Sequence, residues 1–288
     1  MNRSVLRYSV QLIVDIVFFA IAMALNPRQL SLLQAVREHG SVKTETLAEQ
    51  LGIPLQTVRR DLQRLTEAAM LERFHGGVRV VDSSTRNTTY TERQRTQAQA
   101  KQDIARHVAQ AIPNGASLFM NIGTTVEAVA RELLQHKGLR VITNNLHVAH
   151  ILAANPECDV LVAGGTVRHE DLGVVGEAAL AFIRQFKVDI GLIGISGIDA
   201  DGTLRDYDMR EVMVARAIVA QSRQVWLVAD HSKFDRPAMI EMAPLKAVHT
   251  LFTDRAPATA QQRLMEDLGV RCVVAQKGAN TADVQDAI

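Results

Sequence analysis

Apolar residues recur at helical spacing in three successive segments near the start of the chain, residues 27–39, 44–51 and 55–66. In the third segment the leucines and Val58 fall on one face, so the polar residues between them must point elsewhere. A Gly-Gly turn between short apolar runs at residues 70–80 predicts a β-hairpin. Two helices joined by a short glycine-containing turn and followed by a hairpin predict a winged helix-turn-helix.

The third helix would then enter the major groove of DNA, leading with its first turn. We expect Gln56 and Thr57 to reach base edges, and Arg59 and Arg60 to contact guanine or phosphate. The alternative is that the two arginines form an ordinary solvated helix face, but the joint pattern of helices, turn and hairpin favours DNA. The residues predicted to face DNA are Lys43, Thr44, Gln56, Thr57, Arg59, Arg60, Gln63, Arg73 and His75.

Beyond residue 113, short apolar runs alternate with amphipathic segments. This alternation predicts an α/β domain with a mostly parallel sheet that is covered by helices on both faces. The polar, Ser/Thr-rich stretch before it cannot bury a core and predicts a linker. The expected organisation is an apolar N-terminal extension at 1–24, the winged helix-turn-helix at 25–80, the linker at 81–97 and an effector domain at 98–288.

Small and polar residues follow the predicted strands at one edge of this sheet, where ligands of open α/β folds bind. The first strand ends in Gly-Thr-Thr, which opens a helix whose free amides and dipole favour an anion. A lysine after the fifth strand supplies a compact cation for phosphate. Each feature alone has an ordinary explanation as a cap or a turn, but their coincidence predicts a site for a phosphorylated small molecule. The predicted ligand residues are Gly123, Thr124, Thr125, Asn144, Asn145, Gly164, Gly165, Ser196, Asp199 and Lys233.

The composition of the chain limits its domain number, its DNA-binding surface and its cofactors. The 288 residues, 47% hydrophobic and 22% charged, suit two globular domains, and a net charge of +1 makes any DNA-binding face local. Cys158 and Cys272 stand apart without a CxxC pair or a Cys/His cluster, so we expect reduced thiols in the cytoplasm and no metal site. The chain has no glycine fingerprint for dinucleotides or nucleotides, so we expect no cofactor.

The apolar run at residues 8–25 follows two positive charges and leaves three interpretations open. It could be a signal peptide or membrane anchor, although Asp15 in its middle would be costly in a bilayer. It could also be an ordinary helix of a soluble protein. We favour the third interpretation, in which the working protein begins at Met23 and the preceding residues are an over-extended start.

Seven short motifs resemble, in order, those of the DeoR family of bacterial transcription repressors: "TVRRDLQRL", "RFHGGV", "IGTT", "TNN", "AGG", "GISGID" and "DHSKF". The resemblance runs from about Leu25 to about Val273. It implies an effector domain similar to the sugar-phosphate isomerase and coenzyme A transferase fold. It also implies operator DNA as a partner, and a homo-oligomer (dimer or tetramer) bound to paired half-sites.

The resemblance further implies an inducer that is a phosphorylated sugar or polyol. Stretches such as "IPNGASLFMNIGTTVEAVA" and "VADHSKF" are most similar to the family members that repress glycerol 3-phosphate catabolism. The expected inducer is therefore sn-glycerol 3-phosphate, and another sugar phosphate is the alternative. In the expected mechanism, the bound inducer releases the repressor from its operator.

An enzyme is the competing class of function. A sugar-phosphate isomerase or deaminase that had gained a DNA-binding module could use Asp199, Glu211 or Lys233 for proton transfer. The first-strand motif of the family usually has an acidic residue where Asn121 stands here, and the missing carboxylate weighs against such chemistry. We therefore expect a sensor without catalytic activity. An activator is a further alternative, because operator position sets the sign of regulation.

Overall fold

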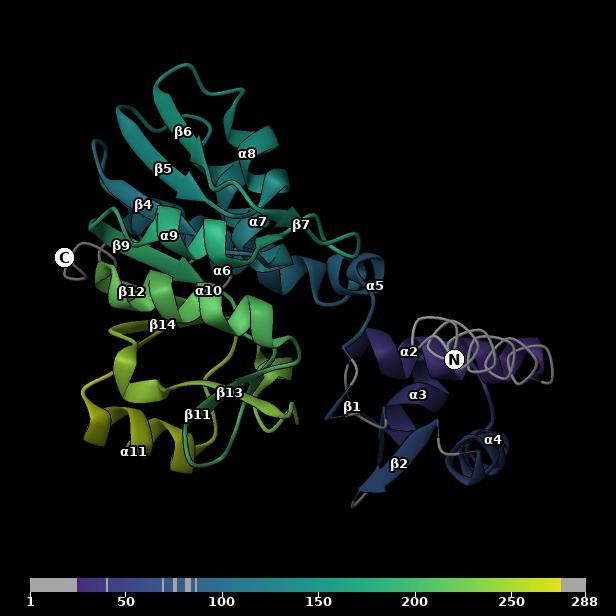
Figure 1. Cartoon of the computed structure of the whole chain (residues 1–288). Coiled ribbons are helices and arrows are strands. Elements are labelled where there is room, and N and C mark those ends of the chain that lie inside the picture. The colour runs from purple at the N-terminus through teal and green to yellow at the C-terminus, as the bar shows by residue number, and fades with distance from the viewer. Residues whose placement is uncertain are drawn as a thin grey trace, which may run out of the picture. The chain divides into compact units, whose positions relative to one another are not determined.

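The computed structural model describes residues 25–275, except 40, 69, 75, 76, 81–83 and 86. The chain divides into two compact units, with the boundary between Val81 and Asp82, and Figure 1 shows the elements of both. The predicted N-terminal extension at 1–24 lies outside the described residues. Within the described part of the chain, no helix is long and apolar enough to cross a bilayer.

The smaller unit confirms the predicted winged helix-turn-helix. Its elements are α2 (Pro27–His39), β1 (Ser41–Lys43), α3 (Thr44–Leu51), α4 (Leu55–Glu67), β2 (Leu71–Phe74) and β3 (Gly77–Val80). The three strands form an antiparallel sheet in the order β1-β3-β2, and β1 was not predicted because three residues are too few to show a periodic pattern. The core consists of Leu32, Leu33, Val36, Val42, Leu47, Val58, Leu62, Leu65, Leu71 and Val78.

The turn between α3 and α4 depends on Gly52. Its φ of 62° lies in the left-handed region, which glycine adopts without a steric penalty. The backbone N–H of Ile53 then donates to the carbonyl of Ala48 at 3.0 Å, and Pro54 leads directly into α4. This compact turn fixes α4 against α3, so that the leucine face of α4 is buried and its polar face is exposed.

A buried carboxylate ties α4 to α2. Asp61 is 1% exposed, and it accepts hydrogen bonds from Arg28 Nε at 2.5 Å and from Gln29 Nε2 at 3.2 Å. Burial alone would raise the pKa of Asp61, but the hydrogen bond and charge of Arg28 lower it below its ordinary value. The fold therefore favours the ionised form. Its contribution to stability is present above the pKa of the unfolded chain, about 4, and is lost as pH falls through the lower folded pKa.

Asp61→Asn is expected to destabilise the smaller unit by about 1–3 kcal/mol at pH 7, because a buried network loses its charged acceptor. The difference from the parent should shrink below about pH 4. Hydrogen exchange of the whole chain would show faster exchange across α2 and α4 with unchanged protection in the larger unit. Asp159→Asn, at an exposed surface pair, is the matched control. Equal exchange in parent and Asp61→Asn would contradict the argument.

The larger unit is built on a seven-stranded parallel sheet with the order β15-β14-β12-β9-β4-β5-β6. Its strands are β4 (Ser117–Met120), β5 (Leu139–Thr143), β6 (Cys158–Val162), β9 (Val188–Ile193), β12 (Ser222–Val228), β14 (Thr250–Thr253) and β15 (Arg271–Val274). The chain runs outward from β4 through β5 and β6, and then returns to place β9 on the other side of β4. The strand order thus reverses between β4 and β9, and ligands of open α/β sheets bind at such a point.

Helices cover both faces of this sheet, as the sequence predicts. One face is covered by α6 (Ala98–Ala111), α7 (Thr124–Glu132) and α8 (Leu146–Leu152), and the other by α9 (Glu177–Ile183), α10 (Met209–Ala220) and α11 (Thr259–Leu268). Figure 1 shows α9 and α10 in front of the sheet. Phe119 of β4 belongs to one core, and its neighbours Leu118 and Met120 belong to the other, because successive side chains of a strand point to opposite faces.

Several short elements of the larger unit were not predicted. They are a hairpin of β7 (Thr166–Val167) and β8 (Val174–Val175), a small antiparallel sheet of β10 (Gly197–Ile198), β11 (Thr203–Asp206) and β13 (Ile240–Pro244), and the helix α5 (Tyr90–Arg95). Helix α5 occupies part of the segment that the sequence assigns to a linker. Its first turn is closed by Thr89 and Glu92, which form a reciprocal capping box. Elements of this length bury too few apolar residues to produce a periodic pattern.

Candidate functional site

The exposed face of α4 carries polar side chains that the sequence predicts to face DNA. Gln56, Thr57 and Arg60 line a surface hollow together with Arg28 and Arg64. Sequence reasoning did not single out the last two residues. Arg64 follows Arg60 by one helical turn, which is a readable signal, whereas Arg28 belongs to α2 and reaches the hollow only through the fold. Three arginines and two first-turn side chains of α4 thus share one surface.

Arg59 lies beside this hollow, on the side of α4 that meets α3 and the wing. Its guanidinium is 3.5 Å from a carboxylate oxygen of Glu45, with about half of each side chain exposed, at 50% and 54%. Its backbone carbonyl accepts a hydrogen bond from Arg73 at 3.3 Å, which ties β2 to α4. An exposed pair of this kind contributes little to stability, so Arg59 can exchange Glu45 for a DNA phosphate at little cost.

The other predicted DNA-facing residues are spread around the same unit. Lys43 is exposed at the end of β1, and Thr44 is partly exposed at the first position of α3. Gln63 is exposed on α4 and donates a hydrogen bond to Glu67 at 3.0 Å. His75 lies outside the described residues.

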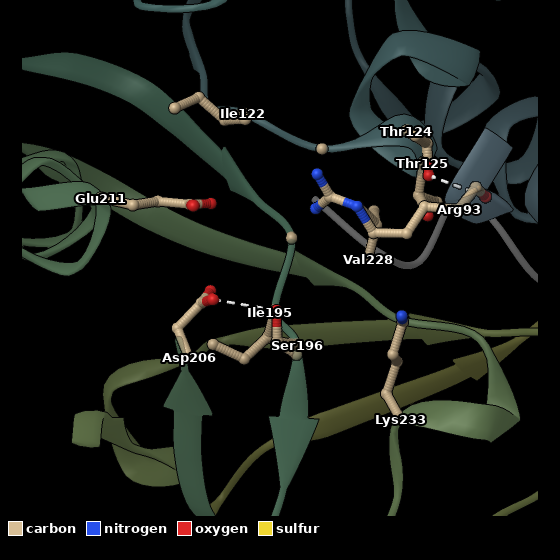
Figure 2. Close-up of a pocket in the computed structure, with 12 residues that line it drawn as sticks. Arg93, Ile122, Thr124, Thr125, Ile195, Ser196, Asp206, Glu211, Val228 and Lys233 are labelled. Carbon is tan, nitrogen blue, oxygen red and sulfur yellow. Dashed lines mark hydrogen bonds between the residues drawn. The ribbon is translucent and has the colours of Figure 1, made fainter. Parts of the chain in front are cut away.

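A pocket lies in the larger unit at the carboxyl ends of β4, β9 and β12, where the strand order reverses (Figure 2). Five of the predicted ligand residues line it: Gly123, Thr124, Thr125, Ser196 and Lys233. The structure adds Arg93, Ile122, Gly194, Ile195, Asp206, Glu211 and Val228. The pocket therefore combines residues from five separate parts of the chain.

The start of α7 forms one wall of the pocket. Gly123, at a φ of 147°, is the N-cap of the helix, and among the residues that the structure describes no side-chain hydrogen bond caps this end. Thr125 is buried, and the hydroxyl of Thr124 donates to the backbone carbonyl of Arg93 at 3.5 Å. Amides without a capping side chain at a helix N-terminus favour an anion.

Two cationic side chains reach into the pocket from different elements, as Figure 2 shows. Arg93 comes from α5, and Lys233 comes from the short 3₁₀ helix η1 (His231–Lys233) that follows β12. Burial is the main cause that lowers the pKa of Lys233 to about 7, and Asp230 opposes this shift. The charges of Arg236, Lys101 and Arg93 lower it further. Because these cations repel one another, an anion bound among them would be stabilised.

Two carboxyl groups, Asp206 of β11 and Glu211 of α10, face the pocket from the other side (Figure 2). Asp206 accepts a hydrogen bond from the hydroxyl of Ser196 at 2.9 Å, and Glu211 is held by Arg168 at 2.8 Å. Burial raises the pKa of both carboxyls, and the charge of Asp206 raises that of Glu211 further. Carboxyl and hydroxyl groups are suitable hydrogen-bond partners for the hydroxyls of a ligand.

The structure places the other five predicted ligand residues away from the pocket lining: Asn144, Asn145, Gly164, Gly165 and Asp199. The two asparagines follow β5 and the two glycines follow β6, and these strands lie progressively farther from the reversal point. Asp199 follows β10, which carries the chain away from Ser196. These residues therefore lie at the same edge of the sheet as the pocket without lining it, and their role in ligand binding stays a prediction.

Local structure explains the residue type at three of these positions, Asn145, Gly165 and Asp199. Asn145 caps α8, where its side-chain oxygen accepts from two backbone N–H groups at 2.9 and 3.4 Å. Gly165 has a φ of 152°, and a Cβ atom there would lie 2.7 Å from the carbonyl oxygen of Val175. Asp199 forms an ion pair with Arg205 across the β10–β11 hairpin.

Sequence reasoning missed Arg93 and Asp206, and it considered Glu211 only for the enzymatic alternative. Arg93 lies in the segment interpreted as a linker, and Asp206 ends a four-residue strand that was not predicted. Asn121 is buried, and its side-chain oxygen has no hydrogen-bond partner among the residues that the structure describes. It does not line the pocket.

Comparison with known proteins gives matches along both units. Residues 28–84 match the DeoR-like helix-turn-helix domain, and residues 96–255 match the DeoR C terminal sensor domain. The glycerol-3-phosphate regulon repressor of Escherichia coli (strain K12) is 45% identical over 245 residues, which are 85% of this chain and 97% of that protein. The protein of the same name from Haemophilus influenzae is 48% identical over 230 residues, 80% of this chain and 89% of its own.

The chain is also similar to a second repressor and, more distantly, to a solved enzyme structure. The HTH-type transcriptional repressor CsqR of Escherichia coli is 40% identical over 254 residues, 88% of this chain and 97% of its own. Among solved structures, ribose 5 phosphate isomerase A from Neisseria gonorrhoeae matches 48% of this chain and 54% of its own, with 13% identity and a TM-score of 0.37. The domain matches and the identity to full-length relatives show that this chain belongs to the DeoR family of transcriptional regulators.

Proposed function

We propose that the protein is a DNA-binding transcriptional repressor of a glycerol regulon that a phosphorylated inducer releases from its operator. One observation carries the proposal: a helix-turn-helix presents Gln56, Thr57 and Arg60 together on the exposed face of α4. The names of the relatives from Escherichia coli and Haemophilus influenzae support the choice of regulon. The repressor acts in the cytoplasm as a homo-oligomer on paired half-sites.

Selection of duplexes from a randomised library tests this function directly. The selected operator should bind the parent protein at least about 10³-fold more tightly than random duplex at the same salt concentration. Equal affinity for all sequences would contradict a sequence-specific repressor.

The two sides of the pocket suggest how the inducer is oriented. Its phosphate lies at the start of α7 between Lys233 and Arg93, and its hydroxyls lie toward Ser196, Asp206 and Glu211. The ligand sn-glycerol 3-phosphate has this distribution, with a dianion at one end and two hydroxyls at the other. We expect the pocket to sense this ligand without turning it over, because Glu211 is engaged by Arg168.

Ligand affinity is expected to be highest between about pH 6 and pH 7. Below about pH 6 a phosphate monoester loses its second charge. Above pH 7, Lys233, whose pKa is about 7, is mostly neutral in the ligand-free protein. Binding a dianion then requires uptake of a proton, so affinity falls by up to about tenfold per pH unit. Calorimetric titration with sn-glycerol 3-phosphate from pH 6 to pH 9 measures this dependence.

The matched control for this pH dependence is Lys233→Arg. A guanidinium stays charged throughout this range, so the decline above pH 7 should flatten in that variant. A parent protein whose affinity stays constant from pH 7 to pH 9 would show that Lys233 does not hold the phosphate.

A further inference from the structure

Helix α5 connects the pocket with the chain that leads to the DNA-binding unit. The smaller unit ends at Val81, and α5 is the first helix after it. The hydroxyl of Tyr90 donates to Glu127 of α7 at 2.8 Å, and its ring stacks on His147 with centroids 4.9 Å apart. Asn87, just before α5, donates to the hydroxyl of Ser196 at 3.3 Å. The segment from Asn87 to Tyr90, which follows the DNA-binding unit, thus contacts residues in and beside the wall of the pocket.

Arg93 is the side chain that α5 sends into the pocket. It is 14% exposed, and Figure 2 shows its guanidinium in the space between Ile122, Glu211 and Lys233. One terminal nitrogen is 3.2 Å from Asp171, while its Nε atom is buried without a hydrogen-bond partner in the described part of the chain. The guanidinium therefore has donor capacity that the ligand-free protein leaves unused.

Asp171 does not depend on Arg93 for its charge partner. Arg168 lies 3.0 Å from the same carboxylate oxygen, so Asp171 stays paired if Arg93 moves away. Lys101 of α6 donates to the backbone carbonyl of Arg93, and to that of Thr96 at 2.8 Å, which closes the last turn of α5 from inside the larger unit. Arg93 is thus held by one exchangeable ion pair, on a helix whose backbone is held separately.

We propose that Arg93 is the residue through which the phosphoryl group of a bound ligand acts on α5, and through α5 on the segment leading to the DNA-binding unit. The anion replaces Asp171 as the partner of the guanidinium, whose planar fork suits phosphate oxygens. Because the ligand binds α5 through this side chain, it favours one arrangement of that helix over another, which is the requirement for coupling two sites. The inference rests on the proposed function, in that the pocket must take a phosphorylated ligand.

The test uses the full chain as parent, Arg93→Met and Arg95→Met. Arg95 lies on the same helix but is exposed and outside the pocket lining, so it is the matched control. For each protein, operator affinity is measured without ligand and at saturating sn-glycerol 3-phosphate, with saturation established by calorimetry for each variant. Hydrogen exchange over residues 87–97 is measured in the same two states. Arg93→Lys, which keeps the charge but loses the fork, replaces the methionine variant if that variant does not fold.

In the parent and in Arg95→Met, ligand should lower operator affinity by about 5- to 150-fold and change exchange over residues 87–97. In Arg93→Met the fall should be less than about twofold, although the ligand saturates the pocket, and α5 exchange should not respond. Parent-like release in Arg93→Met, or unchanged α5 exchange in the liganded parent, would overturn the inference alone. A parent that binds no selected duplex or no phosphorylated ligand would overturn the proposed function and this inference with it.

Discussion

Operator binding is expected to weaken by about 1–3 kcal/mol, about 5- to 150-fold, when Arg60 is replaced by alanine. Arg60 is exposed and lines the same hollow as Gln56 and Thr57, and the buried leucines on the opposite face of α4 hold the helix in place. The substitution removes a long exposed cation and no core contact, so the fold of the smaller unit should be retained. Titration of the selected duplex at several salt concentrations measures the effect.

The salt dependence separates two kinds of contact. If Arg60 binds a phosphate, the slope of log affinity against log salt should fall by about 1, with sequence preference unchanged. If it binds a base edge, preference at one base pair should relax while the slope changes little. Arg184→Ala removes the same charge from an exposed position of the larger unit and is the control. Parent affinity in Arg60→Ala would show that the hollow on α4 does not face DNA.

Lys233→Met is expected to reduce affinity for sn-glycerol 3-phosphate by about 2–5 kcal/mol, which leaves a repressor that the inducer no longer releases. The reason is that Lys233 is a compact cation inside a pocket where its charge has little water to stabilise it. Lys246→Met, at an exposed position outside that pocket, should respond to ligand like the parent. Calorimetry with the ligand measures the loss, and a variant that binds ligand like the parent would refute the phosphate assignment.

Thermal unfolding provides a check that Lys233→Met acts on the ligand rather than on the fold. The folded pKa of Lys233, about 7, lies below that of an exposed lysine, so the unfolded chain binds more protons between about pH 7 and pH 10. The contribution of Lys233 to parent stability should therefore rise with pH across that interval. At pH 7 the methionine variant should melt at or above the parent temperature. Its rise in stability with pH should be smaller than that of the parent, because among the described lysines only Lys101, whose pKa burial lowers to about 8, still contributes to it.

The periodic parts of the fold were predictable from the sequence because their patterns report burial directly. Helix α4 buries one face of leucines, and its sequence shows a helical period. The central strands of the larger unit are buried runs of apolar residues, and the helices that cover its sheet bury an apolar face. The strands β7, β8, β10 and β11 are two to four residues long, so their residues fit no period. Helix α5 was missed for another reason: its residues are polar, and it is fixed by side-chain contacts to the larger unit instead of by an apolar face.

Pocket residues that directly follow a central strand could be predicted from the sequence. Pocket residues that only the topology brings to the site could not. Gly123 and Thr124 follow a central strand, and Lys233 follows another strand near the reversal point, so all three reach the pocket. Asn145 and Gly165 follow β5 and β6, which lie farther from the reversal point. The sequence did not show this, because strand order cannot be derived from one sequence. Arg93 and Asp206 enter from segments remote in sequence, and only the folded chain brings them beside Lys233.

The most direct test of the account is operator affinity of the parent protein as sn-glycerol 3-phosphate is added at pH 7, with glycerol as the uncharged control. A ligand captured by Lys233, Arg93 and the start of α7 must carry phosphate. We therefore predict a fall in operator affinity of about 5- to 150-fold with sn-glycerol 3-phosphate and none with glycerol. Operator affinity that stays unchanged when the pocket is saturated with the phosphate ester, or that falls equally with glycerol, would contradict the account.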